Sequence, residues 1–219
     1  MKNYGCSKVQ AHPWHGIAAG ENVPIIVNAF IETVPFDTVK YEIDKASGHL
    51  KLDRPHKYSS LCPTLYGFIP QTYCGARVAR FAAERCGEDV GRGDQDPLDI
   101  CVLTETTINR SDILVTARPI GGFRLFDRNE VDDKIIAVLL EDSVFGECTS
   151  LSQIPRGLLD RLKHYFLTYK DSPDNTPERH YIEISDVYDV HEARKVIEHA
   201  LTDYEKEFVA DHAALTNLR

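Results

Sequence analysis

The chain lacks the features that mark membrane-spanning and disulfide-stabilised proteins. No stretch of its 219 residues approaches the roughly 20 consecutive apolar residues of a membrane span. Its six cysteines include no Cys-x-x-Cys pair, so we expect reduced thiols and neither a disulfide framework nor a zinc site. No apolar segment follows Met1, so we expect no signal peptide, no membrane partner and a cytoplasmic protein.

Positive charge is also scarce. Lysine and arginine number 25 against 34 acidic residues, a formal charge of −9, which disfavours a nucleic-acid partner because such binding depends on neutralising phosphates with basic side chains. No serine-based nucleophile elbow, glycine-rich phosphate loop or dinucleotide fingerprint is present. The hydrophobic content of 42% supports a sizeable core. We therefore expect one globular domain over residues 1–219, in which residues 1–23 form an irregular leader.

The most informative feature is the acidic segment Gly93–Asp99, which places three carboxylates within six residues. Carboxylates this close repel one another unless a cation lies among them. Pro97 excludes a helix interior or a central strand, and an apolar strand-like stretch follows. The segment predicts a rigid elbow that presents oxygen ligands to Mg2+, with a solvated acidic turn as the alternative. An EF-hand is excluded because its sixth position, Asp99, is not glycine.

Apolar spacing predicts the secondary structure. Alternation indicates strands at 25–32, 39–44, 49–54, 99–104, 113–119 and 134–140, the second and third joined as a hairpin by a turn at 45–48. Helical spacing appears at 158–169 and 191–208, and we expect a long connection at 71–93. Strands first and helices last favour an α+β domain built on an antiparallel sheet or barrel.

Further charges fall near strand ends. Lys40 and Glu42 alternate with apolar residues and point to one face, and Glu32 and Arg54 lie on the strands before and after them. If the sheet curls into a barrel, these four side chains can converge at one mouth; a solvent-facing sheet surface is the alternative. A second acidic loop at 127–133 precedes Lys134, with a charged hairpin turn as its alternative.

Taken in order, these motifs resemble the soluble family I inorganic pyrophosphatases. The resemblance runs from about residue 32 to 171 and rests on Lys40-Tyr-Glu42-Ile-Asp-Lys45, Asp53-Arg54, Tyr66-Gly67, Asp94-x-Asp96-Pro-x-Asp99, Arg118-Pro-x-Gly121, Asp127…Asp132-x-Lys134 and His164…Tyr169-Lys170-Asp171. It implies a five-stranded, OB-like β-barrel flanked by two main α-helices. It also implies Mg2+-dependent hydrolysis of inorganic diphosphate to two phosphates by a metal-activated water, with Mn2+ as a substitute, and a homo-oligomer, a hexamer favoured over a dimer.

The resemblance also implies roles by position. Asp94, Asp99, Asp127 and Asp132 would ligate metal with Glu32 and Glu42 nearby, Asp96 would be the catalytic base, and Lys40, Arg54, Tyr66, Lys134, Tyr169 and Lys170 would contact the phosphates. Flanked by ligands, Asp99 is the natural bridge between two cations. The family usually has tyrosine, asparagine and glycine where this chain has Cys62, Leu65 and Gln95. The connection before Asp94 is longer than in compact bacterial forms, as in chlamydiae.

A charge count explains why this chemistry needs metal. Seven acids and four cations of the predicted site, with a substrate of roughly −4, leave about −7, which three or four divalent cations would nearly cancel. Two alternatives stay open: a metal-dependent nucleotide or phosphoester hydrolase on the same residues, and an OB-type oligonucleotide-binding module. The module would need basic patches interleaved with exposed aromatic residues, and the predicted mouth is acidic.

Overall fold

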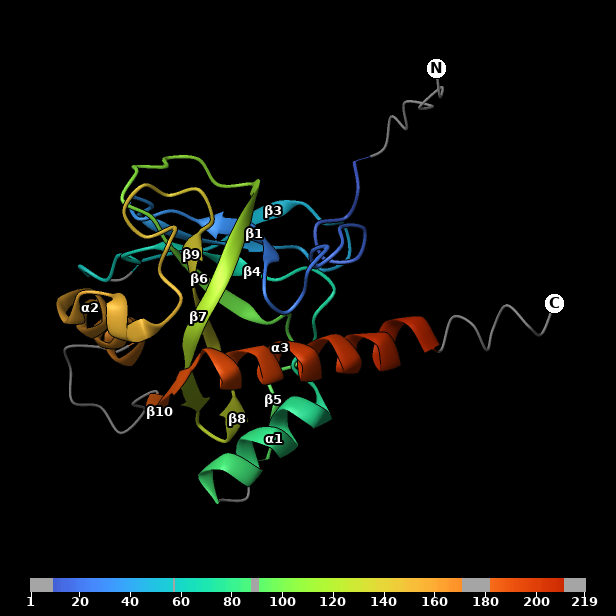
Figure 1. Cartoon of the computed structure of the whole chain (residues 1–219). Helices are drawn as coiled ribbons and strands as arrows, with labels where there is room; N and C mark the ends of the chain where they lie inside the picture. Colours follow the sequence, from blue (N-terminus) through green and yellow to red (C-terminus); the bar gives the residue numbers. More distant parts are fainter. Residues whose placement is uncertain (1–9, 57, 88–90, 171–181, 211–219) are drawn as a thin grey trace.

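The computed structural model describes residues 10–56, 58–87, 91–170 and 182–210 (Figure 1). Its centre is a barrel of five strands in the order β1-β4-β6-β9-β7, closed by pairing of β1 with β7. Within the barrel only β6 and β9 run parallel. The bounds are Val27–Thr33 for β1, Leu65–Phe68 for β4, Asp99–Leu103 for β6, Ile113–Asp127 for β7 and Lys134–Leu139 for β9. The predicted α+β fold around a five-stranded, OB-like barrel is confirmed.

The barrel strands are apolar on both faces because each face packs against a different layer. On β6, Ile100 and Val102 join one core cluster, while Cys101 and Leu103 join another. Helices α1 (Ala76–Cys86) and α3 (Val190–Tyr204) contribute to the first cluster, and α2 (Arg156–Thr168) contributes to the second (Figure 1). This double burial explains why β6 reads as a continuous apolar run.

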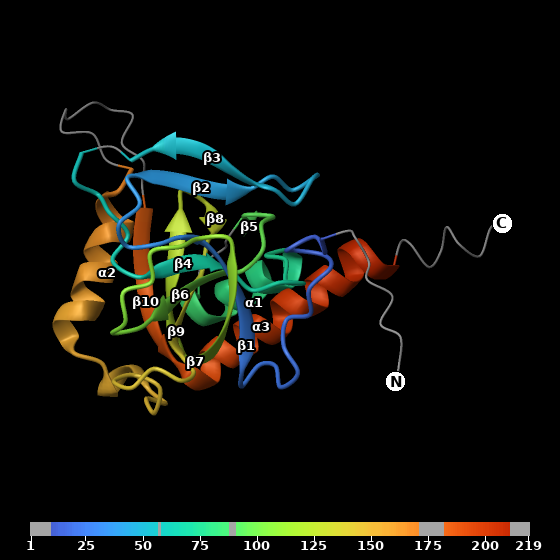
Figure 2. The same cartoon turned by 90° about the horizontal axis from the view of Figure 1, so that it is seen from above.

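Helix α1 corrects the expectation of a long connection at 71–93. Its buried residues Val78, Ala79 and Ala82 follow helical spacing, and Gly87 ends it with a φ of +71°. The three helices pack as α1 against α3, with α2 across the barrel (Figures 1 and 2). The expected helix at 191–208 ends earlier than predicted, because Glu205–Val209 winds as a π-helical turn.

Strand β10 (Ile182–Asp189) was not expected from the sequence. It pairs with the second half of β7, which is why the strand expected at 113–119 continues to Asp127. A bulge between Ile184 and Asp186 interrupts the alternation that would have indicated a strand. The expected hairpin is confirmed as β2 (Val39–Ile43) and β3 (Leu50–Pro55), which lie over one end of the barrel (Figure 2).

Two short strands bring the acidic segments together. Strand β5 (Arg92–Gly93) runs parallel to β8 (Glu130–Val131) and leads directly into the acidic elbow. The expected leader lies partly outside the described residues; its residues 10–23 form turns, and Trp14 in them is buried. No described helix is long and apolar enough to cross a membrane.

A fully buried arginine joins the barrel to two helices. Arg124 of β7 donates to Asp133 from Nε at 3.3 Å and from Nη2 at 3.0 Å, and its Nη1 donates to Glu192 of α3 at 3.0 Å. Arg85 of α1 donates to the other oxygen of Glu192. The rings of Phe81 and Tyr188 lie over the Arg124 guanidinium. Every charge in this buried network therefore has a partner.

Arg124→Met is expected to destabilise the fold by about 3–5 kcal/mol, because it leaves Asp133 buried without its cation. Urea unfolding at pH 7 measures the loss. Arg80→Met on the outer surface of α1 is the control, with an expected effect below about 0.5 kcal/mol. A loss for Arg124→Met no larger than that of the control would contradict the importance of the network.

Asp142 organises the loop that follows β9. Its carboxylate accepts hydrogen bonds from the Thr104 hydroxyl at 2.6 Å and from the backbone N–H groups of Glu105, Val144 and Phe145 at 2.8–3.0 Å. Burial alone would raise the pKa of Asp142, but these donors outweigh it and lower the pKa to about 2. The ionised form therefore stabilises the folded chain.

Asp142→Asn is expected to lower the free energy of unfolding at pH 7 by about 1–3 kcal/mol. Since the folded pKa of Asp142 lies below its unfolded value, the contribution is complete above about pH 4 and disappears as the pH falls toward about 2. Thermal unfolding at several pH values should show the gap between wild type and variant narrowing below pH about 4. A gap that stays constant down to pH about 3 would refute this account.

Candidate active site

The acidic elbow is fixed by hydrogen bonds to the backbone of one residue, Cys74. The Gln95 N–H donates to the Cys74 carbonyl at 3.1 Å, and the Cys74 N–H donates to the Asp96 carbonyl at 2.8 Å. Gly93 packs so closely on Cys74 that any Cβ there would collide with the same carbonyl oxygen. Asp94 then accepts from the Asp96 N–H at 3.0 Å. The elbow predicted from the sequence is therefore held by backbone hydrogen bonds on both sides of Gln95.

Lys134 lies between two of the predicted metal ligands. The parallel pairing of β6 with β9 sets Asp99 beside Lys134, and Asp132 is two residues before Lys134. The buried Lys134 ammonium donates to both carboxylates. Burial alone would lower its pKa, but Asp132 and Asp99 raise it well above its ordinary value. Lys134 therefore stays a cation in the interior.

The pKa values of the neighbouring carboxylates show that several acids share the Lys134 ammonium. Burial, Asp132 and Asp99 raise the pKa of Asp94 well above its ordinary value. Burial opposes ionisation of Asp132 too, but Lys134 lowers its pKa below the ordinary value. Tyr66 donates from its hydroxyl to Asp99 at 2.5 Å. With one ammonium serving three acids, Asp94 is the acid that lacks a cation of its own.

The β2–β3 hairpin supplies the opposite wall. Lys40 and Glu42 lie on one face as predicted, and the Lys40 ammonium donates to Glu42. Arg54 pairs with Lys40 in the ladder. Glu32 of β1 is buried and accepts from the Ile43 N–H at 2.7 Å. Burial raises the pKa of Glu32 to about 8.

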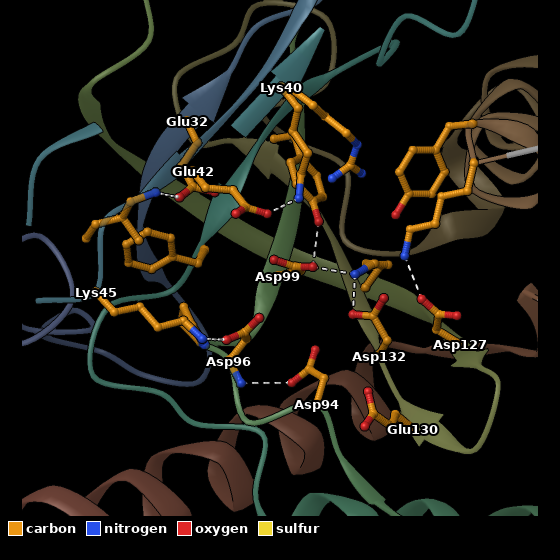
Figure 3. Close-up of a pocket in the computed structure, with 18 of the residues that line it drawn as sticks. Glu32, Lys40, Glu42, Lys45, Asp94, Asp96, Asp99, Asp127, Glu130 and Asp132 are labelled. Carbon is orange, nitrogen blue, oxygen red and sulfur yellow. Dashed lines mark hydrogen bonds and ion pairs between the residues drawn. The ribbon is translucent and has the colours of Figure 1, made fainter. Parts of the chain in front are cut away.

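Lys45, at the end of the hairpin, was not predicted as a site residue. Its ammonium reaches across the cleft and donates to Asp96 (Figure 3). Its carbonyl contacts the His12 Nε2 at 3.1 Å, and Asp44 holds the following turn through Ser47. Its place at the end of the Lys40–Lys45 motif was the only sequence signal.

The end of helix α2 supplies two more side chains. Tyr169 follows the last turn of the helix, and its N–H donates to the Tyr165 carbonyl at 2.9 Å. The Lys170 ammonium donates to Asp127 at 2.5 Å, which joins this helix end to the second acidic loop. The motif residue Asp171 lies outside the described residues.

One cleft of about 540 Å³ brings all the predicted site residues together (Figure 3). They come from β1, β2, β3, β4, the elbow, the β7–β9 segment and the end of α2. The predicted residues in its lining are Glu32, Lys40, Glu42, Arg54, Tyr66, Asp94, Asp96, Asp99, Asp127, Asp132, Lys134, Tyr169 and Lys170; the unpredicted ones are Ile43, Lys45, His56, Phe68, Pro97 and Glu130. The two acidic loops therefore meet, as the prediction required.

The donor set suits a hard divalent cation. The lining holds eight carboxylates and five lysine or arginine side chains, a formal charge of −3 if all are ionised, and no cysteine. Within the described residues no three acidic, histidine or cysteine side chains already form a compact ligand group; lysines lie between the acids instead. Carboxylate oxygens are the ligands that Mg2+ prefers. The residues therefore fit such an ion.

The fold and this cleft define a class: a small OB-like barrel whose mouth gathers carboxylates and lysines around one cleft. A family model described as inorganic pyrophosphatase matches residues 29–205. An inorganic pyrophosphatase of Chlamydia caviae is 47% identical over 208 residues, covering 93% of this chain and 95% of that protein. The chain belongs to the inorganic pyrophosphatase family.

Solved structures agree on the fold. A crystal structure of an inorganic pyrophosphatase from Neisseria gonorrhoeae is similar with a TM-score of 0.71 and 26% identity, covering 86% of this chain and 96% of that one. The structure from Thermus thermophilus gives a TM-score of 0.73 at 24% identity, covering 90% and 99% of the two chains. The barrel and its helices are thus shared well beyond close sequence similarity.

Gln95 has a φ of +65°, a conformation that glycine adopts without strain. Gln95→Gly is therefore expected to keep or raise stability, by up to about 1 kcal/mol. Gln95→Val should lower stability by more than about 1 kcal/mol, because a β-branched residue fits this region worst. Chemical denaturation of both variants tests the point, and equal stabilities of the two would contradict it.

Proposed function

We propose that the chain hydrolyses inorganic diphosphate to two phosphates in this cleft with the help of Mg2+. Family membership at 47% identity over most of the chain supports the reaction. The observation that carries the proposal is the convergence of both acidic loops and the lysines on one small cleft. An acidic cleft that must accept a highly charged anion needs additional cations.

The residues that would hold Mg2+ are the acids of the two loops and of the hairpin wall. When bound, such ions neutralise charge and make a water molecule more acidic. Mn2+ accepts the same oxygen donors and is the expected substitute. We assign this role to Glu32, Glu42, Asp94, Asp99, Asp127 and Asp132.

Asp96 is the proposed base. It lies at the mouth of the cleft, about half exposed, and its carboxylate contacts Lys45 rather than the crowded acids behind it. It is therefore in reach of a water molecule that enters the cleft, and it would accept the proton as that water attacks phosphorus. The reaction is in-line displacement, in which positioning and charge stabilisation do most of the work.

The cationic side chains are the proposed phosphate ligands. Lys40, Lys134 and Lys170 each contact a carboxylate now, so each can turn toward phosphate oxygens without leaving the cleft. Arg54 offers a planar guanidinium suited to two phosphate oxygens. The Tyr169 hydroxyl at the end of α2 is a further donor, and Tyr66 orients Asp99.

The alternatives make different demands on the same cleft. A nucleotide or phosphoester hydrolase needs a surface for an organic group, whereas 13 of the 19 residues that line this cleft are acids, lysines or arginine. An oligonucleotide-binding module would need a basic surface at the barrel mouth, and the mouth is acidic. Three properties remain predictions: that the protein has no nucleic-acid partner, that it is cytoplasmic, and that it is a homo-oligomer, with a hexamer favoured over a dimer.

Phosphate release tests the proposal. The wild-type protein with Mg2+ should release phosphate from diphosphate far faster than from ATP or sugar phosphates, and a chelator should abolish the release. Asp99→Asn should lower turnover at least about 100-fold, because it removes charge at the centre of the acid cluster.

Asp99→Asn should still fold, because Lys134 keeps its ion pair with Asp132 and the variant removes one carboxylate repulsion from the cluster. Circular dichroism and thermal unfolding check the fold. The matched control is Asp160→Asn on the exposed side of α2, which should leave turnover unchanged. If folded Asp99→Asn kept near-native turnover, Asp99 would have no part in catalysis. No phosphate release by the wild type would reject the function.

A further inference from the structure

A second hollow adjoins the cleft and differs from it in charge. It is lined by Gly91, Arg92, Asp127, Arg128, Asn129 and Glu130, of which Asp127 and Glu130 also line the cleft. Figure 3 shows these two acids on the same side of the site as Asp94 and Asp132. The two hollows are therefore neighbours across one short hairpin. We call Gly91, Arg92, Arg128 and Asn129 the arginine shoulder.

The backbone at Arg128 is in an unusual conformation. Arg128 and Asn129 form the two-residue loop between the paired residues Asp127 and Glu130. Arg128 has a φ of +61°, whereas Asn129 is not in the positive-φ region. This order is that of a type II′ turn, in which glycine is the usual first residue. A hairpin turn of this kind requires the positive φ, but arginine in place of the usual glycine puts a long cationic side chain beside the cleft.

The ion pairs between the cleft and the arginine shoulder do not involve Arg128 in the described part of the chain. The Arg92 Nε and Nη2 donate to one oxygen of Glu130 at 2.8 and 2.5 Å, and Lys170 donates to Asp127. Within the described part of the chain, Arg128 has no acidic partner within 4.0 Å. The exposed Arg128 guanidinium and the Arg92 Nη1, which makes no hydrogen bond to the described residues, are therefore donors that line the second hollow.

The shoulder also has space for a ligand. A Cβ on Gly91 would collide with the side-chain amide of Asn129, so the absence of a side chain at 91 lets this amide lie in the hollow. The amide and two guanidinium groups are donors that match phosphate oxygens. In the lining of the second hollow Arg92 and Arg128 balance Asp127 and Glu130, so this hollow is formally neutral, whereas the cleft beside it carries a formal charge of −3.

We propose that the arginine shoulder binds the third phosphoryl group of a linear triphosphate whose other two groups occupy the cleft. The proposal rests on the proposed function, because it takes the cleft as the diphosphate site. The ligand class is a condensed phosphate one unit longer than diphosphate, supplied either as inorganic tripolyphosphate or as the chain of a nucleoside triphosphate. Arg128 would then determine which chain lengths the protein binds tightly.

The test measures inhibition of diphosphate hydrolysis by tripolyphosphate and, in a second arm, by ATP. Arg128→Gln should weaken tripolyphosphate inhibition about tenfold, the size of one charge-assisted contact to phosphate. The kcat and KM for diphosphate should stay within about twofold, because diphosphate does not reach the shoulder. Arg80→Gln on the exposed face of α1 removes the same charge from a residue that lines neither hollow, and it should change neither constant.

Arg128→Gly separates the side chain from the backbone. It should weaken tripolyphosphate inhibition as much as Arg128→Gln does, while the melting temperature stays equal or rises. Weaker inhibition by tripolyphosphate alone identifies the inorganic chain as the ligand, and weaker inhibition by both compounds extends it to nucleotides. Equal inhibition constants for wild type, Arg128→Gln and Arg80→Gln would overturn the proposal.

Two further readouts keep the outcomes distinct. Thermal unfolding with added tripolyphosphate reports binding without turnover, so a stabilisation that Arg128→Gln reduces supports the shoulder even if diphosphate is not hydrolysed. Size-exclusion chromatography follows assembly. If Arg128→Gln altered the oligomeric state and left tripolyphosphate binding intact, the shoulder would be a subunit contact and the proposal would be wrong.

Discussion

The buried ammonium of Lys134 is the interaction on which the site depends. Parallel pairing of β6 with β9 places it beside Asp99, and the short turn before β9 adds Asp132. Without this cation, three acids at one end of the barrel would face each other in a medium of low polarity, which is unfavourable. The barrel therefore has to close correctly for the acids to be tolerated, because the pairing of β6 with β9 is what sets Lys134 beside Asp99.

Four of the five barrel strands were predictable, because β1, β6, β7 and β9 have a clear local pattern, whereas the four-residue β4 was not expected from the sequence. The hairpin around residues 45–48 and the strands from 99 and 134 begin within one or two residues of their expected positions. Strand β10 was not predictable in the same way. Its bulge breaks the alternation, and its partner is the far half of β7, a pairing that only the folded chain reveals. Helix α1 had the right spacing in Val78, Ala79 and Ala82 but was obscured by its exposed arginines.

Most of the candidate site was predictable for a different reason. Its residues sit at strand ends in short motifs that resemble those of one family, and this resemblance placed Asp94, Asp99 and Asp127 in one site; each acidic loop alone had an ordinary turn as its alternative. Lys45 and Glu130 were missed, since a lysine in a turn and a glutamate in a charged loop have ordinary explanations. The Arg124 network could not be foreseen at all. Arg124, Asp133 and Glu192 are not recognisable as partners in the sequence and look like surface charges until packing buries them.

Gln95 and Arg128 are non-glycine residues in a backbone conformation that favours glycine, and the reason differs between the two. Both have positive φ, and both sit in loops beside the cleft. At Gln95 the backbone is held by the Cys74 carbonyl, and its side chain makes no hydrogen bond to the described residues, so the residue is tolerated because of a strong local clamp. At Arg128 the tight turn between the paired residues Asp127 and Glu130 fixes the positive φ, and a charged side chain stands at its first position, where glycine is usual. The turn geometry requires the positive φ but does not require an arginine there, and a guanidinium beside the proposed diphosphate cleft gives that side chain an anion to bind.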